Sequence, residues 1–186
     1  INKEGDIFYS ENQGDWVGSG WIQHLQEDKF NGAIAGLAWQ NEPESKLKVD
    51  TAMLPKENDS ITFPAMTERI KNFQLPAVWF PHSLMGQSLA DMVQDNSNGA
   101  FGPFAGHYFV ADQNQARIMR FTMEKINGVY QGACYPFREG FESGILRMSW
   151  GKDGSLFAGM TDRGWKSIGK KDSGIQRLIW TGKVPF

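Results

Sequence analysis

The stretch GSLFAGMTDRGW, Gly154–Trp165, decides the fold because the chain uses its pattern three times. GDIFYSENQGDW covers Gly5–Trp16, and GHYFVADQNQAR covers Gly106–Arg117. Each stretch begins with glycine, has phenylalanine three residues later and ends in polar residues that are typical of turns. A short strand that runs into a polar turn, repeated in one chain, indicates a series of similar β-units.

Other short apolar stretches flank these units and read as half-buried strands. The predicted strands are Ile7–Ser10, Trp21–Leu25, Ala77–Phe80, Tyr108–Ala111, Ile118–Thr122, Ile145–Trp150, Leu156–Gly159 and Gln176–Trp180. We assign Leu75–Pro81 as the strand that precedes the second repeat in its unit, and Gly144–Gly154 as the one that precedes the third. Consecutive antiparallel strands that stack radially form a β-propeller, whose blades repeat every ~40–50 residues.

The sequence therefore predicts an all-β fold of antiparallel four-stranded blades, with about two and a half blades from the C-terminal portion of a β-propeller. Residues 1–32 form a partial blade, 33–74 a surface insertion, 75–143 a blade and 144–186 a partial blade. The insertion is polar, and Ala65–Phe73 is its predicted short helix. Because propellers typically need four to eight blades, we expect missing blades of the same protein, or a second chain, as the partner.

Composition excludes several classes of function. The net charge is −2, which gives no support for a nucleic-acid partner or an anionic membrane surface. Cys134 is the single cysteine, so a disulfide, a cysteine zinc site and a haem attachment pair cannot form within this sequence. The sequence contains no apolar run of transmembrane length. Nucleotide-binding, zinc-protease and Ser-His-Asp motifs are also absent from it.

Polar clusters follow the equivalent strand of each unit, so we expect them at one face of the propeller. This predicted rim consists of Glu11, Asn12, Gln13, Asp15 and Trp16, then Asp112, Gln113 and Asn114, then Asp162 and Arg163. Converging polar groups can form a ligand site, on which Trp16 and Trp165 would offer flat faces to a sugar. The alternative is that these residues only turn the chain.

Three histidines are candidates for acid–base chemistry. His82 follows a predicted innermost strand, which would place it near the central channel as a base or ligand. A hydrogen-bonded structural role is the alternative for His82. His24 and His107 lie within or beside predicted strands, where a structural role is expected.

The first repeat, GDIFYSENQGDWVGSGWIQHLQEDKFNG, resembles the calcium- and quinone-contacting blade of the soluble glucose/sorbosone dehydrogenases. The rest is similar to a subgroup of dehydrogenase-like propellers from multidomain bacterial proteins, often fused to a c-type haem domain. The matching stretches are LPAVWFPHSLMGQS, FGPFAGHYFVADQ, YQGACYPFREGF, DGSLFAGMTDRGW and QRLIWTGKVPF. This resemblance implies a periplasmic or extracellular location, with any haem on a separate domain.

The resemblance also implies particular site residues. Backbone carbonyls that bind calcium beneath pyrroloquinoline quinone fall near Gln13 and Gly14, although the proline of that motif is missing here. The arginine pair that holds the quinone would fall at Gly144 and Leu146, beside Arg147. The histidine base of the family belongs to a blade that this sequence does not include.

Three functions remain open at this point. The first is part of a sugar or alcohol dehydrogenase-like propeller, in which hydride passes from a carbohydrate hydroxyl to a quinone. The second is a non-catalytic propeller that binds carbohydrate or protein. The third is a scaffold piece of an envelope assembly. The missing arginine pair favours the second and third.

Overall fold

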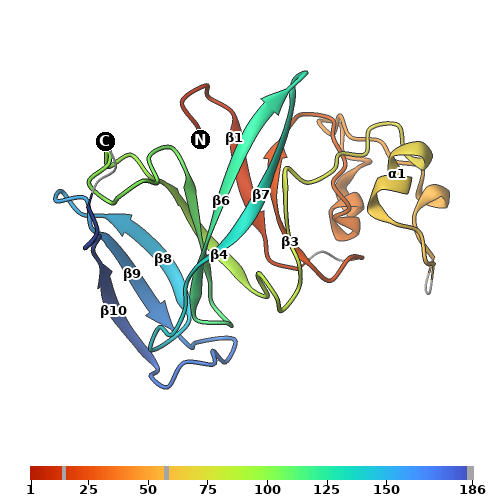
Figure 1. Cartoon of the computed structure of the whole chain (residues 1–186). Coiled ribbons are helices and arrows are strands. Elements are labelled where there is room, and N and C mark those ends of the chain that lie inside the picture. The colour runs from red at the N-terminus through yellow and green to blue at the C-terminus, as the bar shows by residue number, and fades with distance from the viewer. Residues whose placement is uncertain (14–15, 57–58, 184–186) are drawn as a thin grey trace.

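Most of the regular secondary structure of the protein lies in three antiparallel sheets (Figure 1). We analysed a computed structural model, which describes residues 1–13, 16–56 and 59–183. The first sheet contains β1 (Ile7–Glu11), β2 (Gly20–Leu25) and β3 (Val78–Phe80); the second contains β4 (Leu89–Gln94), β5 (Tyr108–Asp112), β6 (Arg117–Ile126) and β7 (Val129–Arg138); the third contains β8 (Ile145–Trp150), β9 (Leu156–Thr161) and β10 (Ser173–Leu178). Every pairing within these sheets is antiparallel.

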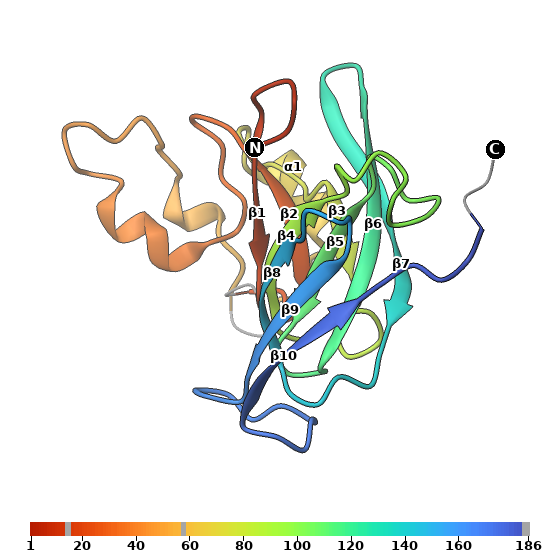
Figure 2. The ribbon, with the colours of Figure 1, turned by 90° about the vertical axis from the view of Figure 1, so that its left-hand side faces the viewer.

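The sheets stack face to face, as Figure 2 shows with the third sheet nearest the viewer. One apolar layer fills the space between the first and second sheets and includes Ile22, Phe80 and Phe121. A second layer fills the space between the second and third sheets and includes Phe109 and Leu156. β1, β4 and β8 lie closest together, while β3 contacts β7 at the outer side. This all-β arrangement is that of a partial β-propeller, as the sequence predicted. The predicted four strands are present in the second sheet, whereas the first and third sheets have three each in the described residues.

The repeated phenylalanines occupy corresponding places in the stack. Phe8 packs into the layer between the first and second sheets, and Phe109 packs into the layer between the second and third. In β9 the alternate residues Leu156, Ala158 and Met160 face the second sheet, so Phe157 lies on the opposite face of its strand. Each phenylalanine therefore points toward the sheet that would come next, and the sheet beyond Phe157 is absent from the described chain.

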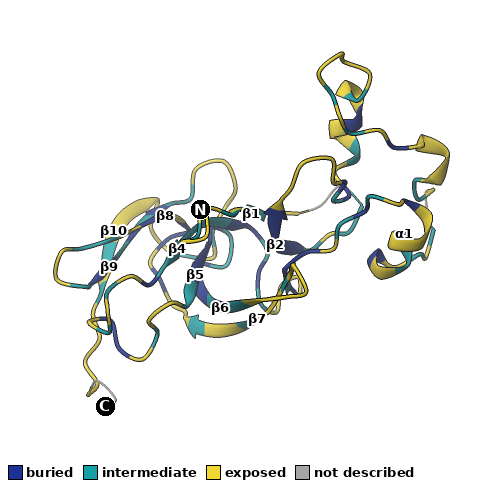
Figure 3. Cartoon of the chain, turned by 90° about the horizontal axis from the view of Figure 1, so that it is seen from above, coloured by how far each residue is buried: buried dark blue, intermediate teal, exposed yellow. Residues whose placement is uncertain are grey.

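The insertion forms a lobe beside the first sheet, visible in Figure 3. It contains two 3₁₀ helices, Ile34–Trp39 and Thr51–Met53, and the α-helix α1 (Phe63–Arg69). Thr62 caps α1 through a hydrogen bond that its hydroxyl accepts from the backbone N–H of Ala65, at 3.4 Å. The predicted short helix is therefore present, although it starts and ends earlier than Ala65–Phe73.

Two features of the strand order differ from the prediction. Val78–Phe80 pairs with β2 and completes the first sheet, so Leu75–Pro81 does not open the second unit. The strand that does so is β4, which was not among the predicted strands, and neither was β7. The predicted unit 75–143 therefore begins with the last strand of the preceding sheet. None of the helices in the described residues is long and apolar enough to span a membrane.

Candidate functional site

The polar loops after β1, β5 and β9 lie at one end of the three sheets, on the lower side of Figure 1. Side chains connect neighbouring loops at this end. Nε2 of Gln113 donates to the carbonyl of Trp165 at 2.6 Å. Nε2 of Gln115 donates to Oε1 of Gln87 at 2.7 Å. Polar side chains therefore tie the loop after β5 to the loop after β9 and to the segment before β4.

Asp112 and Gln113 make their hydrogen bonds within the protein. The side chain of Asp112 is fully buried, and its carboxylate accepts from the backbone N–H groups of Gln87 (2.6 Å) and Gln115 (2.8 Å). Gln113 is 5% exposed and donates to the carbonyl of Thr161 at 3.1 Å. The turn-forming alternative therefore describes these two residues better than the predicted ligand contact does.

The first rim cluster lies only partly in the described chain. Asn12 and Gln13 are exposed, while Glu11 is half-buried and its Oε1 accepts from the backbone N–H of Asn12 at 3.1 Å. Gly14 and Asp15 lie outside the described residues. Asn12 and Gln13 are therefore open to a ligand, and the calcium-contact prediction at Gly14 stays a prediction.

Trp16 has a different role from the predicted sugar platform. Its ring lies 4.9 Å from that of Phe63 and 6.4 Å from that of Phe73, and it packs against the core of the insertion. Trp165 is 67% exposed and retains a free face. In the same loop Asp162 is half-buried and Arg163 is exposed.

His82 is not in the predicted position. It follows β3, which is the outermost strand of the first sheet, and its side chain is exposed. The expectation of a channel-facing histidine at the end of an innermost strand is wrong, because β4 has that place. His107 contacts Arg120, with Nδ1 and Nη1 at 2.6 Å. Burial, together with the charge of Arg120, lowers the pKa of His107.

A hollow of about 380 Å³ lies where the inner strands of all three sheets meet. Its lining residues are Tyr9, Ser10, Ala90, Asp91, Met92, Leu146 and Arg147. We call it the inner hollow. A carboxylate and a guanidinium meet here, an arrangement that suits a hydroxylated or anionic small molecule. Tyr9 also lines the hollow, and its hydroxyl oxygen accepts a hydrogen bond from Nδ2 of Asn31.

Hydrogen bonds fix the walls of the inner hollow. Oγ of Ser10 donates to the carbonyl of Ala90 at 2.7 Å, which ties β1 to β4. Oδ2 of Asp91 accepts from the backbone N–H of Met148 at 2.9 Å, which ties β4 to β8. β8 carries a register shift between Ile145 and the residues that follow, and such bulges commonly redirect side chains beside functional sites.

The two ionisable groups that face each other here keep their charges available. Nη1 of Arg147 lies 3.9 Å from Oδ1 of Asp91, and the arginine side chain is 79% exposed. At this distance and exposure the pair contributes little to stability, so the guanidinium is free to bind an anion. Burial, followed by the charge of Glu11, raises the pKa of Tyr9 to about 12. Tyr9 therefore stays a neutral hydrogen-bonding phenol at physiological pH.

Sequence reasoning found Arg147 but missed Tyr9 and Asp91. Tyr9 is part of the first repeat, but the repeat was defined by the neighbouring Phe8, and Tyr9 was given no role. Asp91 occupies the interior of a strand, where aspartate is uncommon. A charged residue inside a strand was the signal that could have pointed to Asp91. It could be used only once LADMVQ was recognised as a strand, which the sequence analysis did not do.

No model of a known protein family and no curated protein sequence matches the chain. Among solved structures, the chain is similar to a candidate oxidoreductase (glucose dehydrogenase) from Thermus thermophilus. The TM-score is 0.56 at 14% sequence identity, and the match covers 96% of this chain and 43% of that one. The likeness supports the fold. The chain thus spans less than half of the length of that structure.

Proposed function

We propose that the chain forms part of a sugar or alcohol dehydrogenase-like β-propeller that oxidises a carbohydrate hydroxyl with a quinone cofactor. The observation that carries the proposal is the inner hollow, where Tyr9, Asp91 and Arg147 come together from three sheets. The fold likeness to a candidate glucose dehydrogenase points in the same direction. A periplasmic or extracellular location is part of the proposal, because it belongs to the family that the sequence resembles.

The residues of this chain would bind and orient rather than abstract a proton. The guanidinium of Arg147 would form charge-assisted hydrogen bonds to an anionic group. The hydroxyl of Tyr9 already accepts from Nδ2 of Asn31, so its O–H would donate to a substrate oxygen. Asp91 would keep Arg147 near the hollow and remain tied to β8. The base would come from another part of the propeller.

Pyrroloquinoline quinone, when bound, would supply the hydride acceptor. The inner hollow fits one of its carboxylates through the exposed Arg147. It does not reproduce the arginine pair of the resembled family, because a Cβ at Gly144 would lie 2.0 Å from the backbone oxygen of Gln113. In the described part of the chain no group of three His, Cys, Asp or Glu side chains is placed to hold a metal.

The quinone proposal predicts a specific effect of Arg147→Gln. We expect this change to weaken quinone binding about tenfold, since it removes a charge-assisted contact. Arg138→Gln on the outer strand β7 is the matched control and should have no effect. Absorbance titration of the purified protein with pyrroloquinoline quinone, with and without calcium, measures the affinity. Equal affinity of the two variants, or no saturable binding to the unaltered protein, would contradict the proposal.

The outer face of the third sheet bears on what completes the propeller. Ile175 is 76% exposed on that face, opposite Gly159 in the register and next to Arg177. The corresponding faces of the first and second sheets are each covered by the sheet that follows. We propose that a further sheet of the same protein covers this face as well.

Covering of the third sheet can be tested by thiol labelling. An Ile175→Cys variant in a Cys134→Ser background is expected to react slowly with a maleimide in the natural gene product, because a sheet would bury position 175. Lys152→Cys in the exposed turn between β8 and β9 should react fast and is the control. Equally fast labelling at both positions would show that the face is open. Concentration-dependent protection would instead indicate a second copy and sink the proposal.

A further inference from the structure

A pocket of about 450 Å³ lies at the end of the sheets opposite the rim. It is bounded by the end of β2, the segment 73–77 and the start of β7. The lining residues are His24, Gln26, Lys29, Thr67, Phe73, Gln74, Leu75, Pro76, Ala77, Val129, Tyr130 and Gln131. We call it the outer pocket. Its volume lies within the ~300–1,000 Å³ that small-molecule sites usually have.

A buried histidine with a carboxylate behind it forms one wall of the outer pocket. His24 is 7% exposed, and its Nε2 lies 3.4 Å from Oδ1 of Asp6. Oδ2 of Asp6 accepts from the Tyr130 hydroxyl at 2.6 Å and from Nζ of Lys125 at 3.0 Å. These two contacts, the Tyr130 bond first, lower the pKa of Asp6 to about 2. Asp6 is therefore a carboxylate at neutral pH.

This arrangement fixes the orientation and hydrogen-bonding role of His24. The ring of Phe8 stacks on it at 5.1 Å, and the ring of Tyr130 meets it edge-on at 5.1 Å. A carboxylate beside Nε2 favours the tautomer that carries its proton there. Nδ1 is then an acceptor, and no described residue donates to it. Such a nitrogen suits a ligand hydroxyl.

The remaining polar groups of the outer pocket are also available to a ligand. Lys29 is exposed and forms no ion pair within the described residues, so it offers an uncompensated ammonium. Nε2 of Gln74 donates to Oε1 of Gln26 at 2.9 Å. The amide oxygen of Gln74 and the amide nitrogen of Gln26 are therefore available to a ligand. The rings of Phe73 and Tyr130 add apolar surface against which the C–H face of a small molecule can pack.

We propose that the outer pocket binds a small polyhydroxy carboxylate, the chemical class of sugar acids. Lys29 pairs with the carboxylate, His24 accepts a hydrogen bond from a hydroxyl, and the glutamine amides bind further hydroxyls. One unpaired cation matches one negative charge, since Lys125 is already neutralised by Asp6. The site does not depend on the proposed oxidation, because it shares no lining residue with the inner hollow.

Calorimetric titration of the purified protein with sodium gluconate tests the proposal, with glucose and sodium acetate as comparisons. Glucose has the hydroxyls without the carboxylate, and acetate has the carboxylate without the hydroxyls. Gluconate is expected to bind at least about tenfold more tightly than either, because only it satisfies both Lys29 and His24. Binding should also shift the ring resonances of His24 in the NMR spectrum of the protein.

Variants separate the two contacts. Lys29→Gln should reduce gluconate affinity about tenfold, to the level of glucose. Lys152→Gln, at an exposed lysine in the turn between β8 and β9, should leave it unchanged. His24→Asn should weaken gluconate and glucose alike, with folding checked by circular dichroism, and Gln131→Ala serves as a second, exposed variant if His24→Asn does not fold. Absence of saturable gluconate binding, or affinity unaffected by Lys29→Gln, would overturn the proposal.

Discussion

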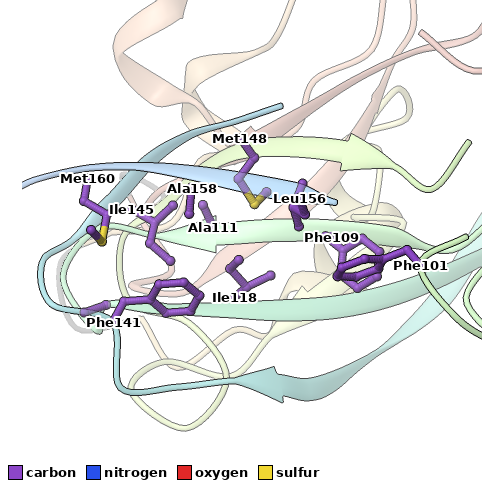
Figure 4. Packing of buried hydrophobic residues seen from close by; sticks show 11 residues of the cluster. Phe101, Phe109, Ala111, Ile118, Phe141, Ile145, Met148, Leu156, Ala158 and Met160 are labelled. Carbon is purple, nitrogen blue, oxygen red and sulfur yellow. The ribbon is translucent and has the colours of Figure 1, made fainter. Parts of the chain in front are cut away.

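Replacing Phe109 by alanine is expected to lower the free energy of unfolding by about 3–5 kcal/mol. Phe109 is fully buried between the second and third sheets, where Figure 4 shows it beside Phe101. Its ring lies 4.7 Å from that of Phe137 and 6.0 Å from that of Trp150, so its removal leaves a cavity lined by rings from two sheets. Such a cavity cannot collapse without moving the sheets against each other.

Phe157→Ala is the matched control, because the repeat places both residues at the same position of their units. Phe157 is half-buried, and the guanidinium of Arg177 lies 5.8 Å from its ring centre. In the described chain its truncation should cost about 1 kcal/mol or less, as for other partly exposed positions. Urea unfolding followed by tryptophan fluorescence measures both values. Equal losses for the two variants would mean that the third sheet is not packed as described.

The repeat predicted the fold because it depends on local chemistry. In each repeat a glycine precedes a short apolar strand, and polar residues follow it and form a turn. The same strand and turn are therefore expected in Gly5–Trp16, Gly106–Arg117 and Gly154–Trp165. The sequence could not predict which strands share a sheet, since pairing is decided by tertiary contacts. Val78–Phe80 has the β-branched and aromatic residues of a strand in either position, and its pairing with β2 decided the outcome.

β7 was missed for a different reason. Pro136 and Gly132 both disfavour strands, so this stretch lacks the usual strand signal. The structure accommodates them because β7 is the outermost strand of its sheet, where one side needs no hydrogen bonds. At Gly132 the chain passes so close to the backbone of Thr122 that a side chain has no room. The residues that look like strand breakers thus fit the edge of a sheet.

The site was predicted least well, because residues that turn the chain and residues that bind a ligand are of the same types and both follow strands. Asp112 has the residue type and the position of a ligand contact, and only its hydrogen bonds to the backbone identify it as a turn former. Arg147 was found through the resemblance. Tyr9 joins it only because β1 lies beside β4, which is a contact between residues far apart in the sequence. Asp6 and His24 likewise meet through the pairing of β1 with β2. They lie away from the polar rim, where the sequence analysis looked for a site.

Gly144→Ala is expected to destabilise the protein by about 3 kcal/mol or more, which is at the upper end of the cost of overpacking. A Cβ on Gly144 would lie 2.0 Å from the backbone oxygen of Gln113 and 2.9 Å from that of Thr161. Both obstacles are main-chain atoms of strand ends at the rim, so they cannot move away as a flexible side chain would. The close approach also brings the N–H of Thr161 within 2.7 Å of the Gly144 carbonyl.

Gly159→Ala in the adjacent strand β9 is the control for this prediction. Its Cβ would meet no atom closer than 3.6 Å, an ordinary contact, so stability should change by less than about 1 kcal/mol. Thermal and urea unfolding of the two variants give the comparison. If Gly144→Ala is as stable as Gly159→Ala, then the second and third sheets are further apart at the rim than the structure places them. In that case position 144 could also hold an arginine, and the full quinone-binding pair of the resembled family would fit this fold.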